Sequence, residues 1–236
     1  MQVLKFGGTS VANAEAIQQV IEIVSRSVDR DRTILVVSAI RGCTDALIRI
    51  GNLASQRDET YKEVIDDLQK QHHQIIKDLL PVEKHEESLE TCDSLFNSLR
   101  SIAQGVYLLG ELSPTSLDAI QGFGEQWSSR IIATKLASIG IATKWVDSRK
   151  IIRTISKGEK TAVDVQKTYS RVNEMIESNP ITQLFVMPGF IASDKQGRTT
   201  TLGRGGSDYS ASLMAVGCKA RALEIWTDVP GMMTSN

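Results

Sequence analysis

Short apolar runs that recur between amphipathic stretches limit the folds open to this chain. Each run is nearly continuous in Val, Ile, Leu or Trp, which is typical of strands in a parallel sheet buried on both faces. Between the runs, apolar residues recur at helical spacing, as in Ile17, Val20, Ile21 and Val24. This alternation predicts βαβ units in a doubly wound α/β fold. We expect the strands at residues 3–6, 33–38, 142–146, 184–188 and 223–227.

A charged and glycine-poor segment, residues 57–110, interrupts this alternation. It predicts a helical insertion of two helices parted near Pro81, which covers or extends the sheet within one domain spanning residues 1–236. The three histidines, His72, His73 and His85, all lie in this insertion and are expected to be solvated. At 190–202, "SDKQG" separates two β-prone runs and predicts a hairpin.

The bulk composition excludes several classes of protein. The net charge is -1, so no general attraction to nucleic acid or to a membrane surface is implied. No apolar run is long enough to cross a bilayer, and a strand that starts at residue 3 leaves no room for a leader peptide. The three cysteines, Cys43, Cys92 and Cys218, lack CxxC spacing, which disfavours a zinc site and fits reducing conditions. We therefore expect a cytoplasmic protein with no metal-ligating residues of its own.

The stretch "VLKFGGTS", residues 3–10, is the first candidate for a binding site. On a strand, Lys5 shares a face with Val3, and a lysine inside a buried strand is costly unless an anion meets it. Gly7 and Gly8 allow the backbone to approach a ligand, while Thr9 and Ser10 can cap the following helix, whose N-terminus favours anions. Together these features predict a phosphate-binding cradle. The alternative is a strand-end lysine that reaches solvent before an ordinary turn.

A second glycine-rich stretch, "TLGRGGSDYSA" at 201–211, precedes a predicted helix. Glycines around Arg204 suit anion binding by a loop and a helix N-terminus, and Arg204 can pair bidentately with a carboxylate or phosphate. Ser207 and Asp208 stand where the helix begins, and Asp208 could simply cap it. A cap alone does not require three glycines and an arginine, so we favour a binding role for the loop.

Other polar residues follow the predicted strands. Thr227 and Asp228 end the last strand, Ser38 ends the second with Thr44 close behind, and Glu125 lies near a predicted helix start. Ligands of open α/β sheets bind at the carboxyl ends of strands, although a turn or a helix-start charge explains these residues almost as well. The tryptophans, Trp127, Trp145 and Trp226, are expected to serve packing. No Ser/His/Asp or Cys/His arrangement indicates a nucleophilic hydrolase.

In combination, these stretches resemble the aspartokinase family. "KFGGTS", "VVSA", Gly124-Glu125, "TTTLGRGGSDYSA" and "IWTDVPG" occur in the family's order and spacing across nearly the whole chain. The opening "VLKFGGTSVANAE" is most similar to the kinase portion of bifunctional aspartokinase–homoserine dehydrogenases. The resemblance implies an amino-acid-kinase fold, with a mostly parallel sheet of the eight-stranded type between layers of helices. It also implies transfer of phosphate from MgATP to L-aspartate, giving ADP and 4-phospho-L-aspartate.

The resemblance also assigns roles to residues. Lys5 would bind the transferring phosphoryl group beside the backbone of Gly7, Gly8 and Thr9, and Asp208 would orient Lys5. Arg204 would hold the α-carboxylate of aspartate and Glu125 its α-ammonium. Further contacts to substrate would come from Ser38, Thr44, Phe190 and Ser207, and contacts to nucleotide from Thr227 and Asp228.

Some features depart from the family. Met232 and Met233 stand after "PG", where a tyrosine is usual, and the chain stops after its last strand, so the domain is expected to be truncated at its C-terminus. The longer protein is expected to be a homo-oligomer. Two alternatives stay open: another amino-acid kinase, acting on glutamate, acetylglutamate or carbamate, or an inert kinase-like domain that binds nucleotide or mediates dimerisation.

Overall fold

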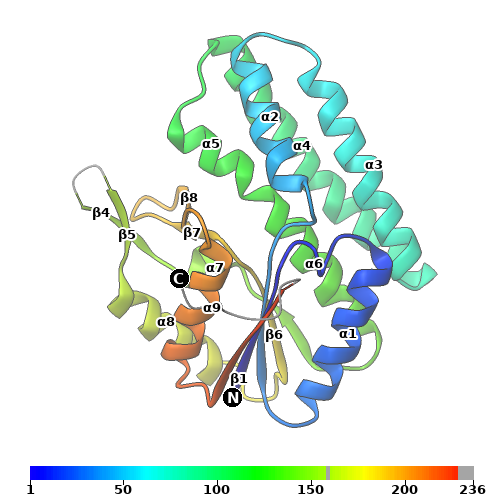
Figure 1. Ribbon diagram of the computed structural model, residues 1–236, viewed down its shortest axis with the longest axis vertical. Coiled ribbons are helices and arrows are strands. Elements are labelled where there is room, and N and C mark those ends of the chain that lie inside the picture. The colour runs from blue at the N-terminus through cyan, green and yellow to red at the C-terminus, as the bar shows by residue number, and fades with distance from the viewer. Residues whose placement is uncertain (158–159, 228–236) are drawn as a thin grey trace, which may run out of the picture.

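The computed structural model of the chain describes residues 1–157 and 160–227 (Figure 1). Within these residues, the five predicted strands form one parallel sheet in the order β3-β6-β2-β1-β9. The strands are β1 Gln2–Phe6, β2 Thr33–Val37, β3 Thr143–Trp145, β6 Leu184–Pro188 and β9 Ala222–Trp226. The α/β prediction is confirmed, with fewer strands in the described sheet than the eight-stranded type implies.

The register of the sheet brings the carboxyl-terminal ends of four strands together, along one edge that runs across the strands. Phe6 lies opposite Val37 and Trp226, and Val37 lies opposite Pro188. Because neighbouring parallel strands end together, the segments that follow β1, β2, β6 and β9 all emerge at this edge. Crossover connections between parallel strands make such an edge the usual ligand-binding side of an open α/β sheet.

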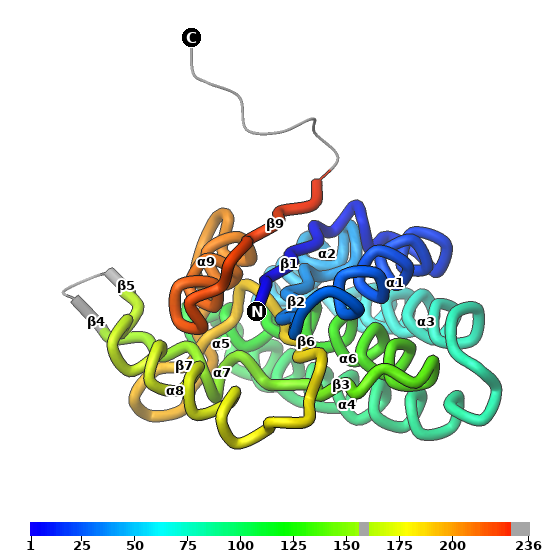
Figure 2. The backbone as a smooth tube through the Cα atoms, turned by 90° about the horizontal axis from the view of Figure 1, so that it is seen from below, coloured from blue at the N-terminus to red at the C-terminus, as the bar shows by residue number. Residues whose placement is uncertain are grey.

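Helices cover both faces of the sheet, giving three layers (Figure 2). Leu4 and Phe6 of β1 point into a large core beneath α1 (Ala14–Val28) and α6 (Phe123–Ser138). Val3 points the other way, into a smaller core beneath α8 (Val165–Glu177) and α9 (Gly206–Gly217). The period of two along a strand explains why consecutive apolar residues of β1 serve both cores.

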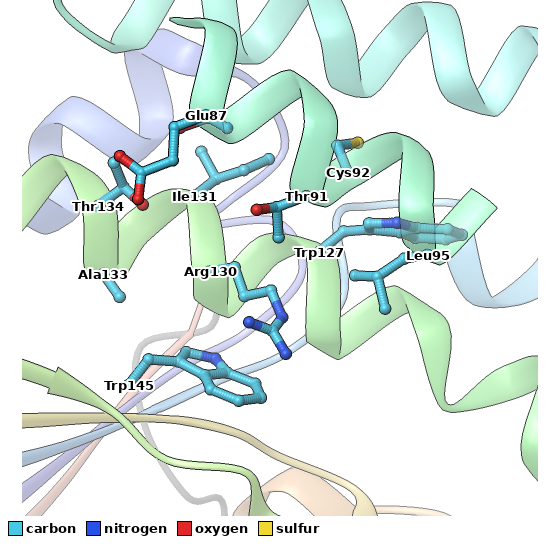
Figure 3. Close-up of a pocket in the computed structure, with 11 residues that line it drawn as sticks. Glu87, Thr91, Cys92, Leu95, Trp127, Arg130, Ile131, Ala133, Thr134 and Trp145 are labelled. Atoms are coloured by element: carbon cyan, nitrogen blue, oxygen red, sulfur yellow. The ribbon is translucent and has the colours of Figure 1, made fainter. Parts of the chain in front are cut away.

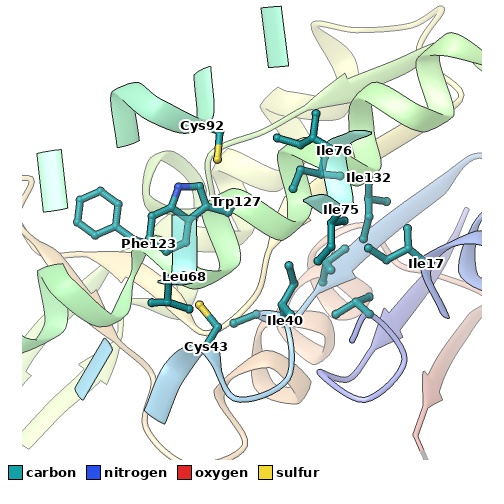
Figure 4. Close-up of a cluster of buried hydrophobic side chains, with 14 of the residues drawn as sticks. Ile17, Ile40, Cys43, Leu68, Ile75, Ile76, Cys92, Phe123, Trp127 and Ile132 are labelled. Carbon is teal, nitrogen blue, oxygen red and sulfur yellow. The ribbon is translucent and has the colours of Figure 1, made fainter. Parts of the chain in front are cut away.

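The predicted insertion, residues 57–110, forms the larger part of a helical lobe that stands beside the sheet (Figure 1). Its two main helices part near Pro81, as predicted, with the short helix η1 between them. Tyr61 and Phe96 are among its largest fully buried side chains, and Phe96 packs against Trp127 of α6 with the ring centroids 4.1 Å apart. Figure 4 shows part of the shared core, in which Ile75 and Ile76 of α3 approach Ile17 of α1 and Ile132 of α6. The lobe is formed by α2 Cys43–Ser55, α3 Tyr61–Leu79, η1 Val82–Lys84, α4 His85–Leu109 and α5 Pro114–Gln121.

The prediction that all three histidines are solvated is wrong. His72 is fully buried, its Nδ1 lies 2.7 Å from Leu68 O, and its ring packs 4.9 Å from that of Trp127. It shares the apolar stripe of α3 with Leu68 and Ile76, which outweighs the charged character of the surrounding sequence. His73 and His85 are half-buried.

Two small antiparallel pairs complete the described structure. β7 (Ile191–Ser193) pairs with β8 (Thr199–Thr201), which confirms the predicted hairpin. β4 (Thr154–Lys157) pairs with β5 (Lys160–Val163), a pair that the sequence pattern did not predict. A single turn of helix, α7 (Ser148–Ile151), precedes β4. No helix of the described residues is both long and apolar enough to span a membrane.

A glycine sets how closely α6 approaches the end of β2, and this gives a testable prediction. A Cβ at Gly124 would lie 2.7 Å from the Cβ of Ala39 and 3.3 Å from Cys43 Sγ. We expect Gly124→Ala to lower the free energy of unfolding by about 1–3 kcal/mol through overpacking. Gly105→Ala, in the middle of α4 with no atom within 4 Å of the added methyl group, is the matched control.

The control should be neutral or stabilising by about 0.5–1 kcal/mol, because alanine is the better helix former. Urea unfolding monitored by circular dichroism measures both changes. Equal midpoints for the two variants would contradict the steric role of Gly124.

Candidate active site

A cavity of about 420 Å³ opens at the strand-end edge of the sheet. Its wall is formed by residues that follow β1, β2 and β6, by the first turn of α6, and by the glycine-rich loop that begins α9. The structure therefore brings stretches from five parts of the sequence to one place. The predicted site residues that line this cavity are Lys5, Gly8, Ser38, Thr44, Glu125, Phe190, Arg204, Ser207 and Asp208.

Lys5 is held inside the protein by an ion pair. Its side chain is only 10% exposed, and its Nζ lies 2.7 Å from Oδ1 of Asp208, which is 46% exposed. The partner comes from the first turn of α9, which packs against β1. The alternative of a strand-end lysine reaching solvent does not apply. The Nζ instead lies at the cavity wall, where it can also meet an anion.

Glycines around Lys5 allow backbone segments to approach closely. A Cβ at Gly8 would lie 2.9 Å from Ala39 O, so the turn after β1 could not pack against the turn after β2 with a side chain there. A Cβ at Gly189 would lie 2.7 Å from Ser207 Oγ. These contacts hold the three loops together at the cavity, so the glycines have a structural reason besides ligand approach.

The glycine-rich loop that leads into α9 departs from helical geometry twice. Gly203 and Gly205 both have φ of +72°, a left-handed conformation that favours glycine. Gly205 is the N-cap of α9, and no side chain of the described residues caps the helix. The alternative interpretation, in which Asp208 caps α9, therefore does not hold. The carboxylate of Asp208 is paired with Lys5 instead. Among the described residues, Gly206 donates its backbone N–H to Gly203 O at 2.9 Å, which leaves the N–H groups of Ser207 and Asp208 for another acceptor.

Glu125 is a buried carboxylate that lacks a full set of partners. The residue is 3% exposed, and its Oε2 has no hydrogen-bond partner among the described residues. Burial raises the pKa of Glu125 to about 8, and backbone hydrogen bonding with Ala39 offsets only part of this effect. A surface charge at a helix start would not be buried in this way. The site suits a cation that enters with a ligand.

Arg204 lines the same cavity from the glycine-rich loop. It is exposed in the glycine-rich loop, and within the described residues its guanidinium has no ion pair or hydrogen bond. A free guanidinium and an unpaired carboxylate thus line the same cavity. Together they can bind both charges of an amino-acid zwitterion, while Lys5 lies beside them as a buried cation.

Comparison with known proteins supports the fold. The profile of the amino acid kinase family matches residues 1–236. The chain belongs to the amino acid kinase family. It is 30% identical to the chloroplastic bifunctional aspartokinase/homoserine dehydrogenase 2 of Arabidopsis thaliana, over 98% of this chain and 25% of that protein. It is 31% identical to lysine-sensitive aspartokinase 3 of Escherichia coli, over 99% of this chain and 50% of that protein.

Solved structures give the same result. E. coli aspartokinase III in complex with lysine and aspartate superposes with a TM-score of 0.87 at 30% identity, covering 98% of this chain and 50% of that one. The same enzyme with aspartate and ADP gives a TM-score of 0.85. This member of the amino acid kinase family therefore has the predicted amino-acid-kinase fold. It spans about a quarter to a half of the length of these relatives.

Several predicted residues of this amino acid kinase lie beside the cavity instead of lining it. Gly7 donates its N–H to Trp226 O at 3.3 Å, and a Cβ there would lie 3.6 Å from Lys5 Nζ. Thr9 lies in the turn after β1, and Thr227 follows β9 at the same edge. The prediction that Thr9 or Ser10 caps α1 is wrong. The turn after β1 is longer than expected, and Asn13 caps the helix by accepting the N–H of Ala16 at 2.8 Å. Asp228, Met232 and Met233 lie outside the described residues.

The tryptophans divide into different environments. Trp127 is 1% exposed and packs in the lobe, as predicted. Trp145 is half-buried, and Trp226 is 39% exposed, with its ring stacked 5.7 Å from that of Phe6. Trp226 therefore packs on one side only among the described residues.

Sequence interpretation missed part of the cavity wall. Asp45 also lines it, next to Thr44 in the first turn of α2, whose N-cap Gly42 has φ of +80°. The signal available was the helix N-terminus that "RGCTDA" begins. Among the described residues, no group of three or more His, Cys, Asp or Glu side chains could hold a metal ion.

Proposed function

We propose that this chain is the kinase part of an aspartokinase. It would transfer the γ-phosphoryl group of MgATP to the β-carboxylate of L-aspartate, the first step of the pathway to lysine, threonine and methionine. The observation that carries this proposal is the cavity in which a buried unpaired Glu125 and a free Arg204 accompany the buried Lys5. The similarity to aspartokinases, one solved with aspartate and ADP, supports the same substrates.

Arg204 and Glu125 would bind the two backbone charges of aspartate. Arg204 donates to the α-carboxylate, and Glu125 accepts from the α-ammonium, which supplies the partner that its buried Oε2 lacks. Ser38, Thr44 and Ser207 add hydroxyl groups to the cavity wall, and Phe190 lies on it with an unusual positive φ of 65°. Fixing both charges directs the side-chain carboxylate toward Lys5.

The reaction itself needs alignment more than acid–base help. An oxygen of the β-carboxylate attacks the γ-phosphorus, and the bond from phosphorus to the bridging oxygen breaks, leaving its electron pair on ADP. Lys5, oriented by Asp208, would neutralise the charge on the transferring group, and the uncapped N-terminus of α9 would offer backbone N–H groups. Mg²⁺, when bound with ATP, would supply further charge neutralisation on the phosphates. Gly7, Gly8, Thr9, Thr227 and Asp228 are proposed to contact the nucleotide.

A panel of acceptors tests the substrate. We expect ADP release from MgATP with L-aspartate but not with glutamate, N-acetylglutamate or carbamate. Activity with another acceptor, and none with aspartate, would support the rival assignment to a different amino-acid kinase. Nucleotide binding with no acceptor-dependent ADP release would support the inert module. Homo-oligomeric assembly and a cytoplasmic location remain predictions of the sequence.

The raised pKa of Glu125 gives a prediction about protons. With a pKa of about 8, the free carboxyl group is mostly protonated near neutral pH, whereas the α-ammonium of aspartate pairs with its ionised form. Aspartate binding should therefore release up to about one proton near pH 7, and affinity should rise with pH until the free group ionises. Calorimetry in buffers of different ionisation enthalpy measures the release.

Glu125→Gln is the control for this measurement, because it keeps the shape and removes the titration. We expect it to abolish the proton release and to weaken aspartate binding. Proton uptake on binding, or equal release from wild type and Glu125→Gln, would contradict the role of Glu125.

A further inference from the structure

A second cavity lies between α4 and α6, closed on one side by Trp145 of β3 (Figure 3). Its volume is about 180 Å³, and it shares no lining residue with the candidate active site. A single water molecule needs only roughly 10–15 Å³ of such space, so this cavity admits a small organic molecule. None of its lining residues has a role in the proposed phosphoryl transfer.

Arg130 is the cation that lines this cavity. Its guanidinium lies 3.6 Å from the centre of the Trp145 ring, and its buried Nε has no hydrogen-bond partner among the described residues. The nearby Asp147 is already paired with Arg149 at 2.7 Å. A buried donor without a partner is costly, and stacking satisfies only the face of the guanidinium. The Nε itself is covered, but the terminal N–H groups, which have no hydrogen bond or ion pair within the described residues, remain available for a planar acceptor.

The other walls favour a compact apolar body. Trp127 and Ile131 are buried and line the cavity beside Leu95, while Thr91 and Thr134 bring hydroxyl groups (Figure 3). The buried Nε1 of Trp127 is a second donor that has no partner among the described residues.

The cavity has one uncommitted cation. Glu87, the carboxylate among the lining residues, is 74% exposed and pairs with Lys84 at 3.1 Å on the surface, so it does not neutralise Arg130. A single guanidinium balances one negative charge, which favours a carboxylate over a phosphate dianion.

Hydrogen bonds fix the Trp145 ring on which Arg130 stacks. Trp145 Nε1 donates to Ser129 Oγ at 2.9 Å, and Ser129 Oγ donates to Glu125 O at 2.6 Å. The indole that supports Arg130 is therefore fixed to α6 by hydrogen bonds. Because Trp145 is already fixed, less conformational entropy is lost when a ligand binds.

We propose that this cavity is a binding site for a small monocarboxylate with a compact apolar body. The carboxylate accepts from the edge of Arg130 and the body lies against Trp127 and Ile131. This site is separate from the aspartate site and does not depend on the proposed kinase activity.

Tryptophan fluorescence of the chain, titrated with 3-methylbutanoate, tests the proposal. Two of the three tryptophans, Trp127 and Trp145, line the cavity. We expect a saturable change with a dissociation constant of about 1 mM or lower. The neutral isostere 3-methylbutanamide should bind at least tenfold more weakly.

Three variants locate the binding. Arg130→Gln should weaken binding at least tenfold. Arg26→Gln, the same change at an exposed arginine in the last turn of α1, should leave it unchanged. Arg204→Gln should also leave it unchanged, which separates this cavity from the candidate active site.

No saturable change, equal binding of acid and amide, or loss in Arg204→Gln but not in Arg130→Gln would overturn the proposal. If circular dichroism shows that Arg130→Gln does not fold, the indole N–H signals in NMR spectra of the wild-type chain test the proposal instead. The carboxylate must then shift the signal of Trp127 or Trp145 and leave that of Trp226 in place. A shift of Trp226 alone would overturn the proposal.

Discussion

Lys5→Ala should abolish turnover without unfolding the protein. Lys5 is the buried cation of the candidate active site, and its Nζ is fixed 2.7 Å from Asp208. Removing a preorganised charge that stabilises the transferring phosphoryl group costs roughly 10²–10³ in kcat or more. A factor of about 10³ corresponds to roughly 4 kcal/mol of transition-state stabilisation. Steady-state kinetics with saturating ATP and aspartate measure the loss.

Lys62→Ala is the matched control for this variant. Lys62 also pairs with a carboxylate, Glu59 at 3.2 Å, but on the exposed surface of the helical lobe. Surface pairs of this kind contribute little, so its kcat should equal that of wild type. Circular dichroism should show both variants folded. A Lys5→Ala variant with kcat within tenfold of wild type would remove Lys5 from the proposed mechanism.

Arg204→Gln should raise the KM for aspartate strongly and leave the KM for ATP nearly unchanged. Arg204 has no ion pair within the described residues, so its guanidinium is available to the α-carboxylate. Loss of such a charged pair costs about 2–4 kcal/mol, or roughly 30- to 1,000-fold in kcat/KM. Because Arg204 is exposed and makes no hydrogen bond or ion pair within the described residues, folding should be unaffected.

Arg198→Gln is the corresponding control. Arg198 pairs with Asp194 at 2.7 Å beside the β7–β8 hairpin, away from the cavity wall. Its kinetics should match wild type. An unchanged KM for aspartate in Arg204→Gln, or an equal rise in the KM for ATP, would show that Arg204 does not select the acceptor.

The sequence predicted the sheet well because apolar runs and strand period are local properties. The alternation of Val3 and Lys5 with Leu4 and Phe6 followed from the period alone, and the two cores confirm it. The same local argument failed for His72, since a charged neighbourhood hid the stripe that it shares with Leu68. It also missed β4 and β5, whose short polar strands carry little apolar signal.

The candidate site was predictable to the extent that it lies at strand ends. Ser38 and the loop around Arg204 follow from that rule, and the cavity includes both. The pairing of Lys5 with Asp208 joins residues far apart in the chain, so it depends on how α9 packs against β1. The burial of Glu125 likewise depends on the tight contact of Gly124 with Ala39, which no local pattern reveals. Arg130 carried no signal, because its importance comes from a cavity between helices.

The most direct measurement is ADP release from MgATP with and without L-aspartate, in the presence of hydroxylamine to trap an acyl phosphate. The proposed function requires aspartate-dependent ADP release together with an equal amount of aspartyl hydroxamate. ADP release that ignores aspartate, or that leaves no hydroxamate, would contradict phosphoryl transfer to a carboxylate. The absence of turnover both in this chain and in a longer one that includes it would contradict the assignment altogether.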